Sequence, residues 1–250
     1  MPLLDKFKNG WKRLTSSSGE GSVLIYQMGK VGSSSIGESV PGSSNMHTLY
    51  GNPPCKVLFD LERKGLWFFL GYFYDLLRRL VIRRRREVKI ISVIRNPIER
   101  NVSMFFQDFP YWYIDYRKRN RSVSRFSDAS VVKDMYETVF PHSYVDEWFD
   151  KEIKRLSGID VYEHPFDREK GFQEYRNGKY SLLLLEMTKI EDNWPVIESF
   201  VGEKLELENE NFGEKKWYGP IYKLHKSDLL NDESVNALVM SGKFYQKFYG

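Results

Sequence analysis

The sequence contains a single cysteine, Cys55, among 250 residues, so no disulfide can form within the chain. The same scarcity argues against a metal cluster built on several thiolates. The first 22 residues show neither an uninterrupted apolar stretch nor a small-residue cleavage site. We therefore expect no secretory signal and a reducing, cytoplasmic compartment.

No charge of one sign dominates, because the chain has 38 Lys and Arg and 34 Asp and Glu, which gives a net charge of +4. Hydrophobic residues make up 41% and charged residues 29%, which is typical of a folded globular chain rather than a disordered one. The length suits one substantial core. We expect a polar lead-in over residues 1–21 and a single domain over residues 22–250.

Short apolar runs separated by helical patterns predict the fold class. Buried strands are expected at residues 22–27, 89–94 and 180–185, and a shorter one at 45–49. Helices are expected at residues 32–40, 60–86, 97–106, 143–156 and 194–201, with a hairpin turn at Asn177-Gly178 and short helices from residue 223. This order predicts an α/β fold, a three-layer sandwich around a central, mainly parallel sheet.

The segment QMGKVGSSSI, residues 27–36, follows the first expected strand and opens a helix. Gly29 and Gly32 let the backbone approach an anion, and Lys30 supplies positive charge. A Walker A loop has Ser or Thr directly after its lysine to hold Mg²⁺, whereas here Val31 follows. The pattern predicts an anion-binding loop of another kind; the alternative is a Gly/Ser turn carrying a surface lysine.

A second anion site is expected after the strand at 89–94, which ends in Arg95 rather than in the acidic residue of a Walker B strand. Ligands of open α/β sheets bind at the carboxyl ends of the strands, and the guanidinium fork suits a phosphate. Ser103 follows eight residues later, about two helical turns on. The two units together predict a nucleotide with two separate phosphate groups, bound without a metal; a capping or ion-paired Arg95 is the alternative.

These residues resemble a known family. Lys30 to Ser35 (KVGSSS) is similar to the 5′-phosphosulfate loop of sulfotransferases of the carbohydrate type, and Arg95 to Ser103 is similar to their 3′-phosphate motif. Residues 182–202 and the end of the chain, residues 243–249, also resemble that family. Residues 158–167 and 216–218 look like a sulfotransferase-like bacterial group of capsular polysaccharide synthesis proteins.

The resemblance implies the P-loop-like sulfotransferase fold and transfer of a sulfuryl group from 3′-phosphoadenosine-5′-phosphosulfate to a hydroxyl of a carbohydrate or related acceptor. Lys30 would neutralise the departing phosphate. The residues implied to bind the donor are Gly29, Lys30, Val31, Gly32, Ser33, Ser34, Ser35, Arg95 and Ser103. No metal is implied. The family often has a proline before the loop lysine, where this chain has Gln27-Met28-Gly29.

A general base is needed to take the proton of the acceptor hydroxyl, and histidine has a suitable pKa. Among the four histidines we favour His47, because it lies on the expected second strand beside the loop strand. A buried structural histidine is the alternative. Glu186, at the end of the third apolar strand, is a second candidate base, and His142 and His225 are weaker ones.

Two aromatic and basic stretches remain. Residues 66–86 are apolar on one side and end in arginines, which predicts a helix packed on the sheet or, alternatively, peripheral contact with the inner face of the membrane. Residues 107–130 are expected to be loops, and the stretch from Tyr111 to Arg125 is expected to line the acceptor cleft. No RNA-binding motif is present, so we expect no nucleic-acid partner.

Two other functions stay open at this stage. One is a P-loop nucleotide kinase or NTPase, which would bind ATP with Mg²⁺. The other is a membrane- or glycan-binding protein that keeps the fold without the chemistry. The sequence leaves the acceptor and the oligomeric state undetermined.

Overall fold

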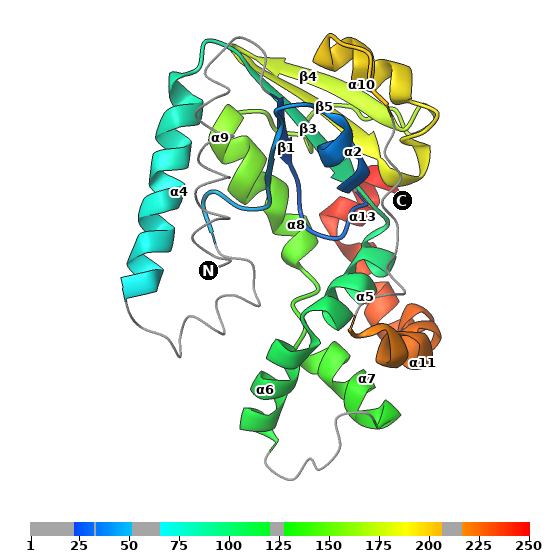
Figure 1. Cartoon of the computed structure of the whole chain (residues 1–250). Helices are drawn as coiled ribbons and strands as arrows, with labels where there is room; N and C mark the ends of the chain where they lie inside the picture. Colours follow the sequence, from blue (N-terminus) through cyan, green and yellow to red (C-terminus); the bar gives the residue numbers. More distant parts are fainter. Residues whose placement is uncertain (1–22, 33, 52–65, 121–127, 207–216) are drawn as a thin grey trace. The chain divides into compact units, whose positions relative to one another are not determined.

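The computed structural model describes residues 23–32, 34–51, 66–120, 128–206 and 217–250 (Figure 1). Cys55 and Ser33 lie outside them, and the side chains of residues 34 and 66–71 are likewise not described. The described residues group into two compact units. The sheet unit comprises residues 23–51, 66–95 and 148–206, and the helical unit comprises residues 96–120, 128–147 and 217–250. The expectation of one domain over residues 22–250 stays a prediction.

The sheet unit is α/β, with five strands in the order β2-β1-β3-β5-β4. The strands are β1 (Val23–Tyr26), β2 (Ser44–Met46), β3 (Val88–Ile94), β4 (Phe172–Asn177) and β5 (Tyr180–Glu186). All neighbours are parallel except β4, which pairs antiparallel with β5. β1 and β3 lie inside the sheet, and every side chain of β1 and nearly all of those of β3 are buried, so both faces of the sheet are covered at these strands. Their unbroken apolar runs therefore predicted them well.

Helices flank the sheet, and Figure 1 shows α4 and α9 to one side of it in this view and α10 to the other. The helices of this unit are α2 (Ser34–Ser39), α4 (Leu66–Arg84), the π-helix η1 (Phe149–Lys154), α9 (Arg155–Ser157), the 3₁₀ turn η2 (Met187–Lys189) and α10 (Trp194–Val201). Among the described residues, none of the helices has the length and apolar character needed to cross a membrane. This part of the architecture agrees with the expected central, mainly parallel sheet.

Two expected elements differ in the structure. The second strand was expected to reach Leu49 but ends at Met46, because the amides of Leu49 and Tyr50 donate to the carboxylate of Glu152 instead of to a strand. The helix expected over residues 143–156 is divided into α8 (Tyr144–Trp148), η1 and α9. Glu152 lies in the π-helix η1. The early end of β2 and the interruption of the expected helix are therefore both linked to this residue.

The helical unit has an aromatic core. Its helices are α5 (Pro97–Gln107), α6 (Phe109–Arg119), α7 (Ala129–Thr138), α11 (Gly219–Leu230), α12 (Glu233–Ser241) and α13 (Lys243–Phe248), and it includes most of α8. The ring of Phe105 lies edge-on to four others, with centroids 5.0–5.9 Å apart: Phe106, Phe109, Tyr136 and Phe140. Aromatic residues in this unit therefore fill the core.

The expectation of loops over residues 107–130 was wrong for the described part, which forms α6 and the start of α7. Trp112 and Tyr116 are buried in the core of the helical unit, so they do not line an acceptor cleft. A spacing of four residues places these two rings on one helix face. That periodicity was the available signal, and it extends over only two buried rings before the basic residues 117–119.

Candidate functional site

The carboxyl ends of four parallel strands meet at one edge of the sheet, and the predicted polar residues follow those ends. The loop with Lys30 follows β1, His47 follows β2 directly, Arg95 follows β3 directly, and Glu186 is the last residue of β5. The pairing of Ile94 with Glu186 confirms that β3 and β5 end at the same level. The candidate side chains at this edge therefore come from the ends of different strands.

The strand order makes the boundary between β1 and β3 a topological switch point. The chain leaves β1 towards β2 on one side and leaves β3 towards β4 and β5 on the other. Connections that diverge in this way leave a crevice beyond the carboxyl ends of the two strands, where open α/β sheets bind ligands. Lys30 and Arg95 belong to the segments that follow these two strands.

The loop after β1 has an unusual backbone. Lys30 has φ +72° and is the one non-glycine residue with positive φ in the described part of the chain, and Gly32 has φ +77°. A side chain in this left-handed region costs about 1–2 kcal/mol. The buried side chain of Val31, 1% exposed, anchors the loop between these two residues. Strain of this kind gathers at ligand-binding and catalytic sites.

Arg95 reaches this loop. Its Nη1 donates to the main-chain carbonyl of Lys30 across 3.4 Å, and both side chains are half-buried. The structure therefore brings together the two cationic residues that the sequence placed in separate anion sites. A crevice at this boundary would carry positive charge on both sides.

The loop is packed against the end of β5 as well. A Cβ at Gly32 would lie 2.7 Å from Sδ of Met187, in the turn that follows Glu186. Glycine at this position is thus required twice, by the positive φ and by the close approach of Met187.

The sequence suggested that His47 lies on the second strand. In the structure His47 lies one residue beyond the end of β2. Its Nδ1 is 3.0 Å from the carbonyl oxygen of Gln27, the first residue after β1. Because a carbonyl can only accept, Nδ1 carries the proton in the neutral ring, and Nε2 carries the lone pair. His47 is exposed, so its ring is not the buried structural histidine that was the alternative.

Glu152 and Trp148 hold the segment that carries His47, and sequence reasoning missed both. Indole Nε1 of Trp148 donates to the carbonyl of His47 across 2.9 Å. One carboxylate oxygen of Glu152 accepts from the amides of Leu49 at 2.7 Å and Tyr50 at 3.1 Å, and also from the Tyr26 hydroxyl. An acidic residue within an amphipathic helix pattern gives no sign of this role.

Burial raises the pKa values of both Glu152 and Tyr26. Glu152 is 3% exposed, and burial raises the pKa of its carboxyl above the usual value, although the three donors oppose that change. Burial, followed by the charge of Glu152, raises the pKa of Tyr26 well above its usual value. Tyr26 therefore keeps its proton at neutral pH and remains a donor to Glu152.

The remaining predicted donor-binding residues are placed as follows. Ser35 is buried in the first turn of α2, and Gly29 is half-buried in the loop. Ser103 is half-buried on α5, in the helical unit. Ser33 lies outside the described residues, and the side chain of Ser34 is not described. A role for these serines stays a prediction.

The other candidate bases, His142, His225 and Glu186, are buried or accept hydrogen bonds from neighbouring groups. His142 is 7% exposed, its Nε2 is 2.8 Å from the carbonyl of Tyr136, and burial lowers the pKa of its imidazole. His225 is buried on α11. The carboxylate of Glu186 accepts from the Thr188 hydroxyl at 3.2 Å. The described residues contain no group of three or more His, Cys, Asp or Glu that could hold a metal ion.

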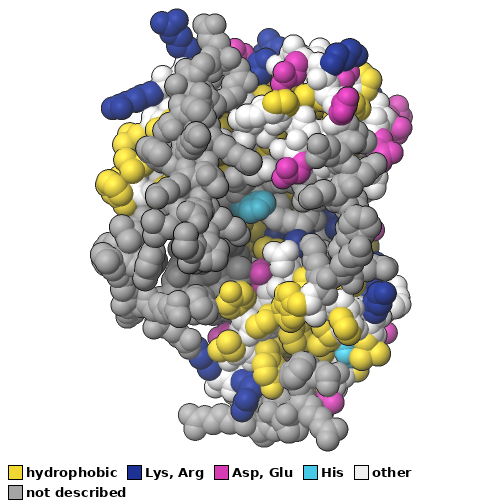
Figure 2. All heavy atoms as spheres, in the orientation of Figure 1, with side chains coloured by type: hydrophobic (Ala, Val, Ile, Leu, Met, Phe, Trp, Pro, Cys, Tyr) yellow, Lys and Arg dark blue, Asp and Glu magenta, His cyan; other side chains and the backbone are white. Residues whose placement is uncertain are grey.

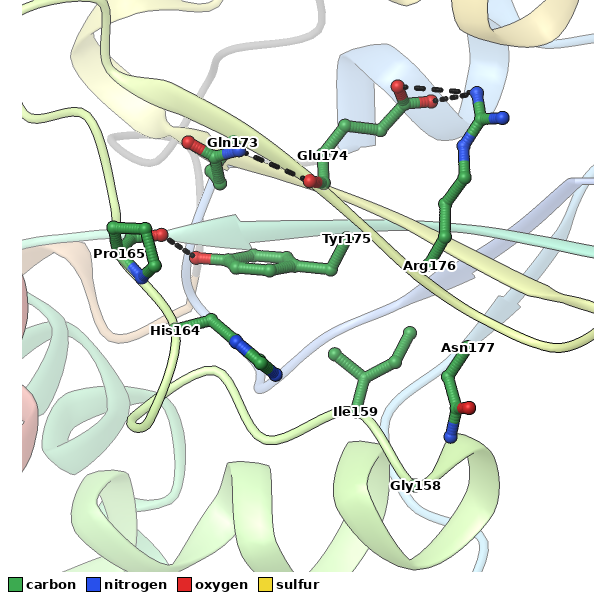
Figure 3. Close-up of a pocket in the computed structure, with 9 residues that line it drawn as sticks. All are labelled: Gly158, Ile159, His164, Pro165, Gln173, Glu174, Tyr175, Arg176 and Asn177. Atoms are coloured by element: carbon green, nitrogen blue, oxygen red, sulfur yellow. Dashed lines mark hydrogen bonds and ion pairs between the residues drawn. The ribbon is translucent and has the colours of Figure 1, made fainter.

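A separate pocket of about 490 Å³ lies beside the edge strand β4 (Figure 3). Its lining consists of Gly158, Ile159, His164, Pro165 and the strand residues Gln173, Glu174, Tyr175, Arg176 and Asn177. The Tyr175 hydroxyl donates to the carbonyl of Pro165 across 3.0 Å, so the ring is held along the wall. Figure 3 shows Glu174 and Arg176 joined to each other and pointing away from Tyr175. None of the predicted site residues lines this pocket.

Comparison with known protein families places part of the chain. Residues 128–250 match the family NKWYS, described as "Putative capsular polysaccharide synthesis protein". The match covers just under half of the chain. No curated protein and no solved structure matches the chain. The similarity supports a connection with capsular polysaccharide synthesis and a glycan-related function.

The matched part of the chain contains β4, β5, the pocket beside β4, and α7 to α13. It does not contain β1, β3, Lys30 or Arg95. The cationic edge of the sheet and the family similarity are therefore independent observations.

Proposed function

We propose that this protein is a sulfotransferase that moves the sulfuryl group of 3′-phosphoadenosine-5′-phosphosulfate to a hydroxyl of a carbohydrate. The observation that carries the proposal is the meeting of Arg95 with the loop of Lys30 at the β1–β3 switch point. A nucleotide with phosphates at both ends of its ribose needs two cationic groups in separate positions, and adjacent strand ends supply them. The similarity of residues 128–250 to capsular polysaccharide synthesis proteins supports a glycan acceptor.

The donor would be held mainly by fixed charge. Arg95 would bind the 3′-phosphate, for which its planar fork is well suited. The loop from Gly29 to Ser35 would enclose the phosphosulfate, with Lys30 beside it. Since α2 has only six residues, the side-chain cations and loop amides, rather than the dipole of this short helix, would supply most of the attraction.

The transfer itself requires one proton movement and one displacement at sulfur. Nε2 of His47 takes the proton of the acceptor hydroxyl while the oxygen of that hydroxyl bonds to sulfur. The bond from sulfur to the 5′-phosphate oxygen breaks, and that oxygen keeps the electron pair. Lys30 compensates the charge that develops on the departing phosphate, so catalysis depends on positioning and electrostatics. The products are the sulfated glycan and adenosine 3′,5′-bisphosphate.

Calorimetry with adenosine 3′,5′-bisphosphate tests the nucleotide site. We expect binding in the presence of EDTA, weaker binding of 5′-AMP, and a loss of at least about tenfold in affinity for Arg95→Ala, the range for a charged hydrogen bond. Arg176→Ala is the matched control, because this exposed arginine of β4 pairs only locally, with Glu174. Its affinity should equal that of the unaltered protein.

Two results would contradict the assignment. Equal affinity for 5′-AMP and the bisphosphate would remove the 3′-phosphate site. Tight binding of ATP that depends on Mg²⁺, together with weak binding of the bisphosphate, would favour a nucleotide kinase or NTPase instead.

The base is tested separately, by following transfer of radioactive sulfate from the donor to capsular glycans. His47→Ala should lower the turnover number by about 10²–10⁴-fold and leave bisphosphate affinity unchanged. Glu186→Gln serves as a comparison, because Glu186 is the second candidate at the same edge. Loss of turnover in Glu186→Gln with normal turnover in His47→Ala would transfer the role to Glu186. Nucleotide binding without transfer to any glycan would favour a non-catalytic glycan-binding protein.

A further inference from the structure

One face of α4 exposes large apolar side chains. Tyr72 is 63% exposed, Phe73 56%, Leu76 37% and Leu80 43%. At about 100° per residue these four positions lie within an arc of roughly 100° on the helix. Figure 2 shows hydrophobic side chains gathered along the outer margin of this helix. A solvent-exposed stripe of this kind on one helix marks an interaction surface.

The opposite side of α4 is attached to the sheet unit. Ile82 is fully buried, and Nη1 of Arg79 donates to the carbonyl of Leu49 across 2.8 Å. Asp75, the one acidic residue between positions 72 and 84, pairs with Arg78 at 3.1 Å, away from the exposed arc. The exposed stripe is therefore not the packing face of the helix, and it carries no negative charge.

Exposed arginines continue the stripe at the end of α4. Arg83 and Arg84 are exposed in its last turn, and Arg86 is exposed just beyond it. Arg83 also donates to the Tyr50 hydroxyl at 3.3 Å, which fixes its position. Figure 2 shows Lys and Arg side chains next to the apolar group at this end of the helix. Glu87 follows, so the basic group ends there.

We propose that α4 docks the protein on an anionic lipid surface, with Phe73, Leu76 and Leu80 in the boundary between headgroups and acyl chains and Arg84 and Arg86 on lipid phosphates. Helices that lie in the membrane interface combine an apolar face with basic residues in this manner. Charge complementarity identifies the partner, because an apolar protein surface would not require the arginines. This docking is independent of the proposed sulfuryl transfer.

Vesicle co-sedimentation of the full chain tests the proposal without nucleotide or glycan. We expect the protein to pellet with vesicles of phosphatidylcholine mixed with phosphatidylglycerol, to bind phosphatidylcholine alone weakly, and to dissociate as salt is raised. Leu76→Ser/Leu80→Ser and Arg84→Gln/Arg86→Gln should each lower binding at least about tenfold. Because all four side chains are exposed, neither pair should lower the melting temperature appreciably.

Matched controls use exposed residues elsewhere. Leu224→Ser/Leu238→Ser removes two apolar side chains of 66% and 60% exposure, and Lys204→Gln/Arg176→Gln removes two charges. Both controls should bind vesicles normally. The proposal is overturned if the unaltered protein does not bind anionic vesicles or if the controls lose binding equally. It is also overturned if the protein dimerises in solution and Leu76→Ser/Leu80→Ser abolishes the dimer, because the stripe would then contact a second copy.

Discussion

The guanidinium of Arg95 donates to the backbone carbonyl of Lys30, which joins the end of β3 to the loop that follows β1. This contact holds a lysine whose backbone is in the left-handed region, with φ +72°. The strain and the contact lie at the same place in the fold, so the loop has a defined shape before any ligand binds. Such preorganisation lowers the cost of binding.

We therefore expect the backbone of Lys30 to lower the stability of the fold and its ammonium group to contribute to nucleotide binding. Lys30→Gly relieves the left-handed strain, whereas Lys30→Ala keeps it, so we expect the glycine variant to be more stable than the alanine variant by about 1 kcal/mol. Both variants should lose affinity for adenosine 3′,5′-bisphosphate to a similar degree, because both lack the ammonium group. Urea unfolding and calorimetry measure the two effects. Equal stability of the two variants would show that the loop relaxes in solution.

Gly32 should tolerate no side chain. Gly32→Ala places a Cβ against Met187 and a non-glycine residue at φ +77°. We expect a loss of about 2–3 kcal/mol in unfolding free energy, of which the left-handed backbone contributes about 1–2 kcal/mol. Adding Met187→Ala should recover the part that comes from the clash and leave the backbone part. Full recovery in the double variant would mean that the left-handed conformation is not required.

Glu152 should matter for both stability and turnover. Glu152→Ala leaves the buried amide of Leu49, the Tyr50 amide and the Tyr26 hydroxyl without their acceptor, and we expect a loss of about 3 kcal/mol. Glu152→Gln keeps one acceptor oxygen and should lose less. At temperatures where it is folded, Glu152→Gln should lower glycan transfer more than nucleotide affinity, because the segment with His47 shifts. Exposed Glu203→Ala is the control.

Asp232 should give the helical unit an acid-sensitive contribution to stability. Burial alone would raise the pKa of its carboxyl, but hydrogen bonds from the Val235 amide, the Ser234 hydroxyl and the Lys133 ammonium group outweigh it and lower the pKa to about 2. Because the folded pKa lies below the unfolded value, this stabilisation is present above about pH 4 and is lost as the pH falls towards 2. It amounts to at most about 2 kcal/mol, because solvent screens the exposed Lys133 partner.

Melting temperatures between pH 7 and pH 2.5 measure this contribution. Asp232→Asn keeps the helix cap and removes the titration, so its melting temperature should fall less steeply with acid. A variant that follows the same acid profile as the unaltered protein would rule out Asp232 as a source of the acid sensitivity.

The sequence predicted the parts of the fold that depend on local pattern. Apolar runs bounded by turn residues placed β1, β3 and β5, and glycine with lysine after β1 marked the loop. It did not predict the π-turn at Glu152, because that turn is held by amides about a hundred residues earlier in the chain. Likewise, α6 was missed since its buried rings depend on packing with α5 and α7 rather than on a local apolar run.

The same distinction applies to the site. The sequence predicted that Lys30 and Arg95 follow the carboxyl ends of strands, because each follows a strand that is readable from sequence, and such ends converge in a parallel sheet. The register that brings Arg95 to the Lys30 carbonyl, and the tautomer that the Gln27 carbonyl imposes on His47, depend on three-dimensional contacts. No pattern in the sequence predicts this register or this tautomer.

The position of β3 at the centre of the sheet has a consequence for how the protein forms during synthesis. The loop after β1 leaves the ribosome before β3 and β5 do, because β1 pairs with β3 more than sixty residues later along the chain, and β3 pairs with β5 about ninety residues after that. Pairings so distant along the chain form slowly. A nascent chain that has not yet produced residue 186 lacks one neighbour of its central strand, so the loop after β1 gains its shape only after β5 has been made.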